Sequence, residues 1–189
     1  MSLVPAFEIG IWNAWLFMIW LLIQTIGIRL ASKDLYRRAG QPSDMKPSQT
    51  HKIVSHVSMP TWLLSTLYSI FLPFPLGTAA FYVGLAIFLL GLIILIITTV
   101  NFAATPFNEP ITRGIYRYSR HPMYIAIFLT YLSVGIASVS WVFLLVSIVW
   151  LVLISLTVND EERYCLEKYG VAYREYMNRT PRWIGIPKQ

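Results

Sequence analysis

The stretch MYIAIFLTYLSVGIASVSWVFLLVSIVWLVLISLTV, residues 123–158, holds no charged residue across 36 positions. A membrane-spanning helix needs about 20 apolar residues, so the stretch is too long for one span and slightly short for two. Its middle, VGIASVSW, contains a glycine and several small or hydroxyl residues, which suit a tight turn. We therefore expect a helical hairpin, with one span over 123–137 and the next over 140–158.

Three further apolar blocks precede this hairpin, at residues 11–30, 53–74 and 78–100. The chain is 56% hydrophobic and only 13% charged, whereas a soluble domain usually has about 25% charged residues. The first block has no positive residue before it, so it lacks the charged start of a cleavable signal peptide. The sequence therefore predicts an all-α integral membrane protein, a single domain over residues 1–189 with five transmembrane helices.

The charged residues are distributed as five spans require. All fifteen Lys and Arg fall on one side of that topology, in Arg29–Lys52, at Arg113, Arg117 and Arg120, and in Arg163–Lys188. Because cytoplasmic loops carry the excess of Lys and Arg, we expect the N-terminus outside and the C-terminus in the cytoplasm. The net charge of +6 is then a topology signal, and without a soluble basic domain we expect no nucleic acid partner.

Disulfide and metal chemistry are not expected. Cys165 is the only cysteine, so the chain cannot form a disulfide framework or a thiolate metal cluster. The three histidines, His51, His56 and His121, are far apart in sequence and lack the spacing of metal ligands.

The segment RGIYRYSRHPMY, residues 113–124, concentrates arginine, tyrosine and histidine where the hairpin begins. Pro122 suits the first position of a helix, where its missing N–H costs nothing. The free amide groups of such a helix start attract a carboxylate or a phosphate. Gly114 permits a close backbone approach, and Tyr116 or Tyr118 could stack on a planar ligand. The alternative is an anchor at the membrane interface without a binding role.

Three consecutive acids, Asp160, Glu161 and Glu162, follow the hairpin. They are either a solvated boundary or carboxylates that bind a cationic or hydrogen-bond-donating ligand. A hairpin returns the chain to the side where it began, so these acids and the RHP segment should lie close together. We expect the tail from Asp160 to Met177 to form a helix on that side, and Pro181–Gln189 to form a docked strand or coil.

RGIYRYSRHPMY and, after the hairpin, EERYCLEKYGVAYREYMNRTPRW together resemble the isoprenylcysteine carboxyl methyltransferase family and the related phospholipid methyltransferases. In detail the chain is similar to the short, five-span prokaryotic or archaeal members. The resemblance covers residues 101–186, and the first two spans match only in hydropathy. The combination of RHPxY, EE and YGxxYxxY is specific, whereas each piece alone would be weak.

The resemblance implies S-adenosylmethionine as the methyl donor and S-adenosylhomocysteine as the product. The sequence contains no GxGxxG, so the donor must be held without the glycine-rich turn of a dinucleotide-binding fold. The first paired acid is the one that contacts the cofactor in family members. The cofactor contacts carried over by motif position are Tyr116, His121, Pro122, Met123, Tyr124, Glu161 and Glu162, together with the stretch Asn108, Glu109, Pro110 and Ile111.

One position departs from the family pattern. Eukaryotic members carry an arginine implicated in substrate handling four residues before the first paired acid, and here that position is Thr157. Arg120 is the substitute that we expect to orient the substrate.

The function implied is methylation of the C-terminal carboxylate of a prenylcysteine-like, lipophilic substrate at the cytoplasmic surface of a prokaryotic cell membrane. Such a carboxylate has a pKa of about 3.5, so it is ionised at neutral pH and needs no general base. The enzyme would work by alignment and by exclusion of water. The aliphatic tail of the substrate could enter sideways between spans, with membrane lipids as the surroundings.

Three alternatives stay open. Methylation of a phospholipid amine would require deprotonation of an ammonium, and the clustered arginines disfavour a cationic acceptor but suit its phosphate. NADPH-dependent sterol reductases carry similar RHP and KYG…Y signatures, but they are longer and have more spans. A non-enzymatic membrane scaffold would leave the co-occurrence of the three motifs unexplained.

Overall fold

The computed structural model describes residues 8–31 and 45–188, and the regular elements within these ranges are helices. A single isolated bridge pairs Asn13 with Pro73. The all-α prediction is therefore confirmed. Positions 32–44, between the first two apolar blocks, lie outside the described residues. The helices are α1 (Trp15–Ala31), α3 (Gln49–Ser69), α4 (Ala79–Ala104), the 3₁₀ helix η1 (Gly114–Arg117), α5 (Pro122–Ala137), α6 (Trp141–Tyr169) and α7 (Val171–Arg179).

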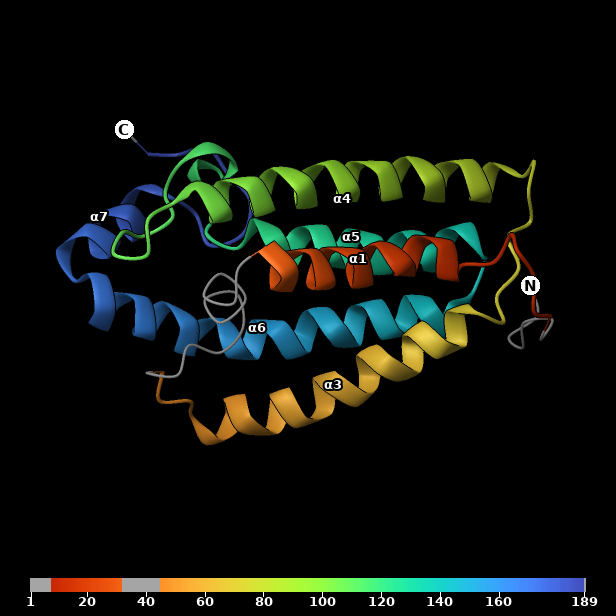
Figure 1. Ribbon diagram of the computed structural model, residues 1–189, viewed down its shortest axis with the longest axis horizontal. Helices are drawn as coiled ribbons and strands as arrows, with labels where there is room; N and C mark the ends of the chain where they lie inside the picture. The colour runs from red at the N-terminus through yellow and green to blue at the C-terminus, as the bar shows by residue number, and fades with distance from the viewer. Residues whose placement is uncertain (1–7, 32–44, 189) are drawn as a thin grey trace.

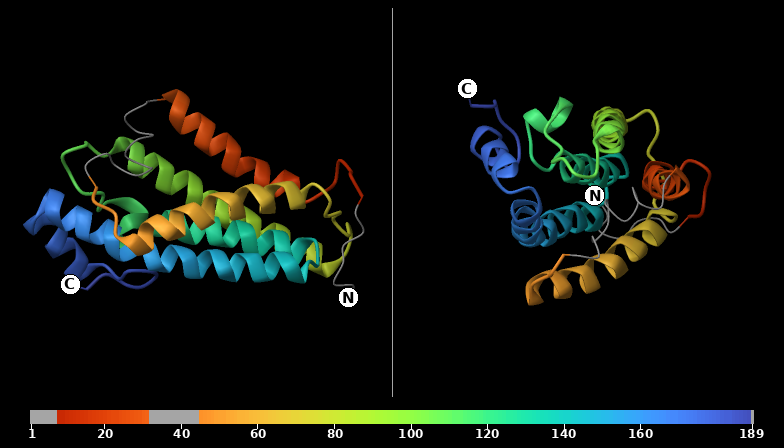
Figure 2. Two further views of the ribbon diagram at one scale, coloured as in Figure 1. Left: turned by 90° about the horizontal axis from the view of Figure 1, so that it is seen from below. Right: turned by 60° about the vertical axis from the view of Figure 1, so that its left-hand side comes forward.

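The five long helices lie side by side and alternate in direction. Figures 1 and 2 show α1, α4 and α6 running toward the end of the molecule that carries α7, whereas α3 and α5 run away from it. The 3₁₀ helix η1 and the C-terminal segment lie at the same end, and the described N-terminal residues lie at the opposite one. This path brings the start of α5 and the last turns of α6 to one end of the bundle.

Two helices, α4 and α6, are long and apolar enough to cross a membrane. Their most apolar windows have mean hydropathies of 2.9 and 2.7. Only 17% of that window is buried in α4 and 33% in α6, so most of this apolar surface faces outward, as it does in contact with lipid. The helices α1 and α5 are also apolar but have only 17 and 16 residues, so the count of five spans stays a prediction.

The hairpin turn lies where the sequence predicts it. Helix α5 ends at Ala137, α6 begins at Trp141, and the two helices pack against each other. Val139 in the turn has φ +54°. Ser140 caps α6, because its hydroxyl accepts a hydrogen bond from the Phe143 N–H at 3.2 Å. The Ser140 hydroxyl thus satisfies one of the free amides at the start of the returning helix.

The first two helices differ from their apolar blocks at the ends. Helix α1 begins at Trp15 instead of residue 11, because Asn13 is engaged in the bridge and its side-chain amide donates to the Ile70 carbonyl at 2.7 Å. Helix α3 begins four residues before its block, where the Ser48 hydroxyl accepts from the His51 N–H at 3.1 Å. Capping groups, which hydropathy does not register, set these boundaries.

The tail also differs from the prediction. The sequence predicts one helix over 160–177, but α6 continues without a break to Tyr169, and α7 forms a second helix after Gly170. Gly170 has φ +55°, a conformation that favours glycine. The tail is helical as predicted, but its first part continues α6, because the change from apolar to polar residues near position 159 does not interrupt a backbone of helix-compatible residues, and the only difference is the break at Gly170.

Helices α4 and α5 approach each other closely at two glycines. A Cβ added to Gly84 would lie 2.5 Å from the Ala137 Cβ and 2.6 Å from the Ala137 N. A Cβ added to Gly91 would lie 3.1 Å from the Leu129 Cβ. Small residues at such contacts let helix backbones pack closely in membranes. The two glycines therefore fix α5 against α4 over most of its length.

We expect Gly84→Val to force this contact apart and to lower the free energy of unfolding by about 1–3 kcal/mol, the usual cost of overpacking. Thermal unfolding in detergent, followed by circular dichroism, measures the change. Gly27→Ala is the matched control, because a Cβ at Gly27 meets nothing within 4 Å and alanine is the better helix former. An undiminished stability of Gly84→Val would contradict the close packing of α4 and α5.

Candidate active site

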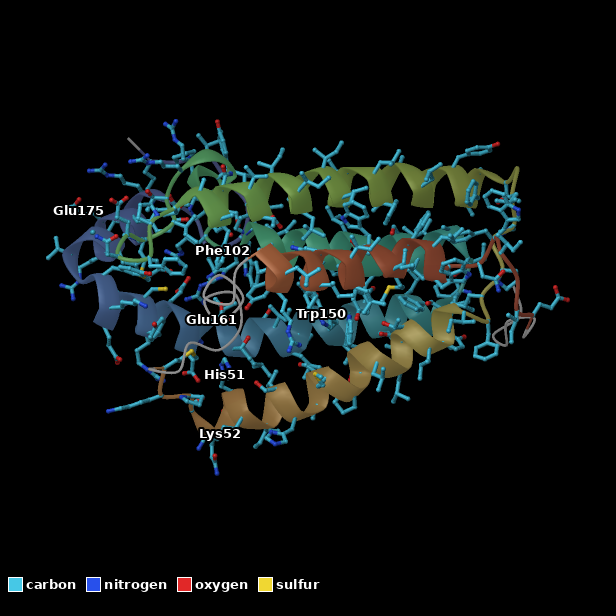
Figure 3. The ribbon with its side chains drawn as sticks, viewed as in Figure 1. His51, Lys52, Phe102, Trp150, Glu161 and Glu175 are labelled. Carbon is cyan, nitrogen blue, oxygen red and sulfur yellow. The ribbon has the colours of Figure 1, made fainter. Side chains whose placement is uncertain are left out.

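Three consecutive acids lie on the part of α6 that extends past the predicted span. Helix α6 has 29 residues, which at 1.5 Å per residue makes it about 44 Å long, against about 30 Å of membrane hydrocarbon. Asp160, Glu161 and Glu162 lie in the extension, and each contacts a different neighbour. Figure 3 shows Glu161 at this end of the bundle, between α6 and the helices around it.

Glu162 is the centre of a buried ionic cluster. Its side chain is 4% exposed, and its Oε1 lies 3.1 Å from His121 Nε2. Arg182 donates from Nε to Oε1 at 3.2 Å and from Nη2 to Oε2 at 2.6 Å. Arg120 Nε lies 2.9 Å from Oε1 as an ion pair, without the alignment of a hydrogen bond. Every oxygen of this carboxylate is therefore engaged by the protein.

These contacts decide the charge of Glu162. Burial opposes ionisation, but the hydrogen bonds from His121 and Arg182 and the charge of Arg120 outweigh it. Together they lower the pKa of the Glu162 carboxyl to about 2. The carboxylate is therefore ionised at any physiological pH.

The C-terminal segment is docked against the residues that precede α5. The Arg120 N–H donates to the Pro181 carbonyl at 3.1 Å, and the Gly185 N–H donates to the Tyr118 carbonyl at 3.1 Å. The docked coil predicted after α7 is thus present, in its described residues up to position 188. This docking brings Arg182 to Glu162.

Glu161 faces α5 and is only partly enclosed. Its Oε1 accepts a hydrogen bond from the Tyr124 hydroxyl, and its Oε2 lies 3.8 Å from His121 Nδ1. Its side chain is 30% exposed, against 4% for Glu162. Burial among its neighbours raises the pKa of the Glu161 carboxyl, and the Tyr124 hydrogen bond and the charge of His121 offset this only in part. Glu161 is therefore the more exposed of the two paired acids.

The start of α5 lies against these two acids. His121 is the N-cap residue but provides no side-chain cap, and Pro122 occupies the first turn. The Ile125 N–H bonds to the His121 carbonyl at 3.4 Å. The amides of Met123 and Tyr124 precede that first backbone bond of the helix. An uncapped helix start of this kind carries partial positive charge and attracts anions.

The two residues considered for the substrate carboxylate are engaged within the protein. Arg120, besides its ion pair with Glu162, donates from Nη1 to the Met177 carbonyl at 3.0 Å. Thr157 is 8% exposed, and its hydroxyl donates to the Ile154 carbonyl at 2.9 Å. The Arg120 guanidinium is therefore paired, and position 157 carries no cation.

The remaining predicted residues lie on the segment that connects α4 with α5. Tyr116 is buried in η1, and its carbonyl accepts a hydrogen bond from the Tyr176 hydroxyl at 2.7 Å. The stretch Asn108–Ile111 follows the end of α4, where Ile111 packs against Phe102. The structure thus brings His121, Tyr124 and the paired glutamates together, and it places Asn108–Ile111 on the segment between α4 and η1.

Sequence reasoning missed two residues of this region, Arg182 and His51. Arg182 lies in a short Pro- and Gly-containing tail, and only the need to balance a buried carboxylate could have indicated it. His51 lies in the first turn of α3, where its Nδ1 is 3.8 Å from Asp160 Oδ2. The partners His51 and Asp160 are more than 100 positions apart in sequence, and no local pattern links them.

A family model described as phospholipid methyltransferase matches residues 76–172, just over half of the chain. The chain belongs to the phospholipid methyltransferase family. Among curated proteins, none matches it. The matched range contains α4, α5 and the whole of α6, and so includes His121, Tyr124 and both paired glutamates. The resemblance noted in the sequence is thereby confirmed.

Membership of the phospholipid methyltransferase family has two direct consequences. Proteins of this family are methyltransferases that use S-adenosylmethionine, so the chain is a methyltransferase and not a reductase or a scaffold. Together with the outward-facing apolar surfaces of α4 and α6, membership also makes it an integral membrane protein.

We expect Glu162→Gln to lower the free energy of unfolding by about 3 kcal/mol, because removing one partner leaves buried charges unpaired. Chemical or thermal unfolding in detergent measures the change. Glu167→Gln is the matched control on the same helix. Its side chain is 67% exposed and lies 4.0 Å from Arg163, and such surface pairs contribute at most about 1 kcal/mol.

The same variant should change the response to acid. The folded-state pKa of Glu162, about 2, lies below the value of about 4.3 for an unfolded glutamate. Its stabilising contribution is therefore complete above about pH 4.3 and is lost as the pH falls through about 2. Between pH 5 and pH 2 the unaltered chain should lose about 3 kcal/mol more than Glu162→Gln. If the free energies of unfolding of the two proteins fell equally as the pH falls, the cluster would not be ionic.

Proposed function

We propose that this protein transfers a methyl group from S-adenosylmethionine to an amine carried by a membrane lipid. The observation that carries the proposal is the contrast between two adjacent glutamates. Glu162 is enclosed by Arg120, His121 and Arg182, whereas Glu161 is 30% exposed beside the uncapped start of α5. A partly exposed carboxylate next to free helix amides suits a ligand that carries both a positive and a negative group.

The donor and acceptor groups fit the charges of S-adenosylmethionine. Its amino-acid part carries a carboxylate, which the amides of Met123 and Tyr124 at the helix start would hold. It also carries an ammonium group, which Glu161 would hold by a charge-assisted hydrogen bond. When bound, the cofactor would supply a methyl group on a positively charged sulfur, and the lone pair of an acceptor would take that methyl group with the neutral thioether as the leaving group.

Other residues of the chain position these contacts. Tyr124 donates to Glu161, and His121 lies between the two glutamates, with Nδ1 toward Glu161 and Nε2 toward Glu162. The ionic cluster therefore fixes the imidazole and, through it, the start of α5. Tyr116 and the stretch Asn108–Ile111 stay proposed contacts to the rest of the cofactor, because they lie on the segment that leads into α5.

We also propose five membrane spans, with the N-terminus outside and the candidate active site in the cytoplasm. The support is the alternation of the five long helices, which brings the end of α1, the start of α3 and the C-terminal segment to the same end of the bundle (Figure 1). The Lys and Arg of these segments then lie on one side, as cytoplasmic loops require. The active site would lie at the level of the lipid head groups.

The charges around the site favour an amine over the prenylcysteine carboxylate that the resemblance first suggested. Arg120 is paired with Glu162, and position 157 is a buried threonine, so neither offers a cation to a carboxylate. Arg113 and Arg117 are exposed on the segment before α5 and are available for a lipid phosphate. A phospholipid amine matches both features.

We expect Glu161→Gln to weaken the binding of S-adenosylmethionine about tenfold or more, because a charge-assisted hydrogen bond is worth about 1.5–3 kcal/mol. Isothermal titration calorimetry of the purified protein in detergent measures the affinity. Glu175→Gln is the control, since Glu175 is exposed on α7, away from Glu161 in Figure 3. Equal affinities of the two variants would remove Glu161 from the site.

The acceptor is identified by methyl transfer from labelled S-adenosylmethionine. One reaction contains vesicles of a phospholipid with a primary amine head group, and a second contains a prenylcysteine analogue in vesicles without amines. We expect label in the phospholipid and not in the prenylcysteine. Label in the prenylcysteine alone would overturn the amine assignment, and no transfer to either together with no cofactor binding would overturn methyl transfer.

A further inference from the structure

His51 is a buried titratable residue that the proposed cofactor site does not use. It lies in the first turn of α3 and is 4% exposed. Within the described ranges its Nδ1 is enclosed and has no hydrogen-bond partner. The nearest charged group is Asp160, whose Oδ2 lies 3.8 Å from this nitrogen. A buried ring nitrogen without a partner is costly, so this arrangement calls for an explanation.

Asp160 is held in place by groups other than His51. Its Oδ2 accepts from the Ser48 N–H at 2.9 Å, and its Oδ1 lies 3.0 Å from Arg163 Nη2. Burial opposes ionisation, but the hydrogen bonds from Ser48 and the charges of Arg163 and His51 lower the pKa of the Asp160 carboxyl. His51 therefore faces a fixed negative charge.

That charge selects the tautomer of His51. A lone pair on Nδ1 would face a carboxylate, which is repulsive, whereas a proton on Nδ1 would face it favourably. Neutral His51 therefore carries its proton on Nδ1, and its basic lone pair is on Nε2. A carboxylate beside one ring nitrogen leaves the other as the proton acceptor, which is the division of roles in a carboxylate–histidine pair that acts as a general base.

His51 also lies close to the proposed cofactor site. Figure 3 shows His51 on α3 near Glu161 of α6, at the same end of the bundle. A charge on His51 contributes to the pKa of the Glu161 carboxyl, so the two side chains are within electrostatic reach. The groups that face His51 from α6 are Asp160 and, farther off, Glu161.

We propose that His51 takes the proton that a lipid ammonium must lose before it can be methylated. The inference rests on the proposed amine acceptor. Nε2 of neutral His51 accepts a proton from the ammonium, whose N–H bond breaks and leaves a lone pair on nitrogen. That lone pair forms the new N–C bond as the C–S bond breaks, and sulfur keeps the electron pair of the broken bond. The proton then leaves His51 for water.

The other titratable groups nearby are less suited to this step. Both ring nitrogens of His121 face carboxylates, so His121 has no lone pair directed at a substrate. Glu162 is fully engaged, and Glu161 is assigned to the cofactor. Within the described ranges, His51 has a carboxylate near one ring nitrogen only, since Asp160 Oδ2 lies 3.8 Å from Nδ1 and Nε2 faces no carboxylate within 4 Å.

The test compares His51→Gln with His56→Gln across the pH range. His56 is on the same helix, but it is exposed and its Nδ1 contacts the Lys52 carbonyl at 2.7 Å. Methyl transfer to the amine phospholipid in vesicles is measured with the full chain from pH 6 to pH 10. At pH 7, His51→Gln should be slower by about 100-fold or more, the usual contribution of a general base. His56→Gln should match the unaltered chain.

The pH profile separates a proton acceptor from a structural residue. At neutral pH the unaltered chain should be faster than His51→Gln, whose rate should rise toward the pKa of the amine, about 10, because without a proton acceptor only the free amine reacts. The two rates should therefore converge at high pH, while the affinity for S-adenosylmethionine stays the same. A His51→Gln rate that is reduced by one factor at every pH would overturn the inference.

A second variant guards against misfolding of the first. Asp160→Asn keeps an acceptor for the Ser48 N–H but removes the negative charge beside His51 Nδ1, so its rate at pH 7 should be lower than that of the unaltered chain. An unchanged profile for Asp160→Asn would overturn the inference. If the unaltered chain methylates no amine, the proposed function fails and this inference with it. If the chain methylates the amine and His51→Gln has the same pH profile as the unaltered chain, this inference alone is overturned.

Discussion

The buried carboxylate of Glu162 joins three parts of the chain: α6, the start of α5 and the segment after α7. Removing an ion from water costs several kcal/mol, and only well-placed partners offset that cost. Here they come from His121, Arg120 and Arg182. Because Glu162 lies on α6, Arg120 and His121 lie at the start of α5 and Arg182 follows α7, the ionic cluster can form only when all three segments are in place. The position of the α5 helix start, and hence of any ligand bound there, depends on this cluster.

The sequence predicts the architecture well, because the architecture depends on hydropathy and helix-starting residues. The uncharged stretch 123–158 is too long for one helix and has small residues at its middle, so the hairpin follows. The hairpin in turn brings Pro122 and the paired acids together. The end of α6 could not be predicted in this way, because hydropathy changes near position 159 but the backbone has no reason to break before Gly170.

The division of roles between the paired glutamates could not be predicted from the sequence. Glu161 and Glu162 are identical residues in one motif, and only their surroundings separate them. One surrounding group, Arg182, comes from a short tail without a periodic pattern, and its position depends on backbone contacts made far along the chain. Pairings of this kind arise from tertiary docking, and no local spacing reports them. The same holds for His51, because its sequence neighbours show only that it lies in the polar stretch between the first two apolar blocks.

The spacing of the three acids explains why they do different things. Successive residues of an α-helix point about 100° apart, so Asp160, Glu161 and Glu162 cannot all face one ligand. They face three directions instead: α3 with its Ser48 cap, the start of α5, and the docked C-terminal segment. Two of these contacts are buried and tie the helix end to its neighbours, which leaves Glu161 exposed between them. The rigidity that a methyl-transfer site needs is thus supplied by the residues on either side of Glu161, which we propose as the cofactor contact.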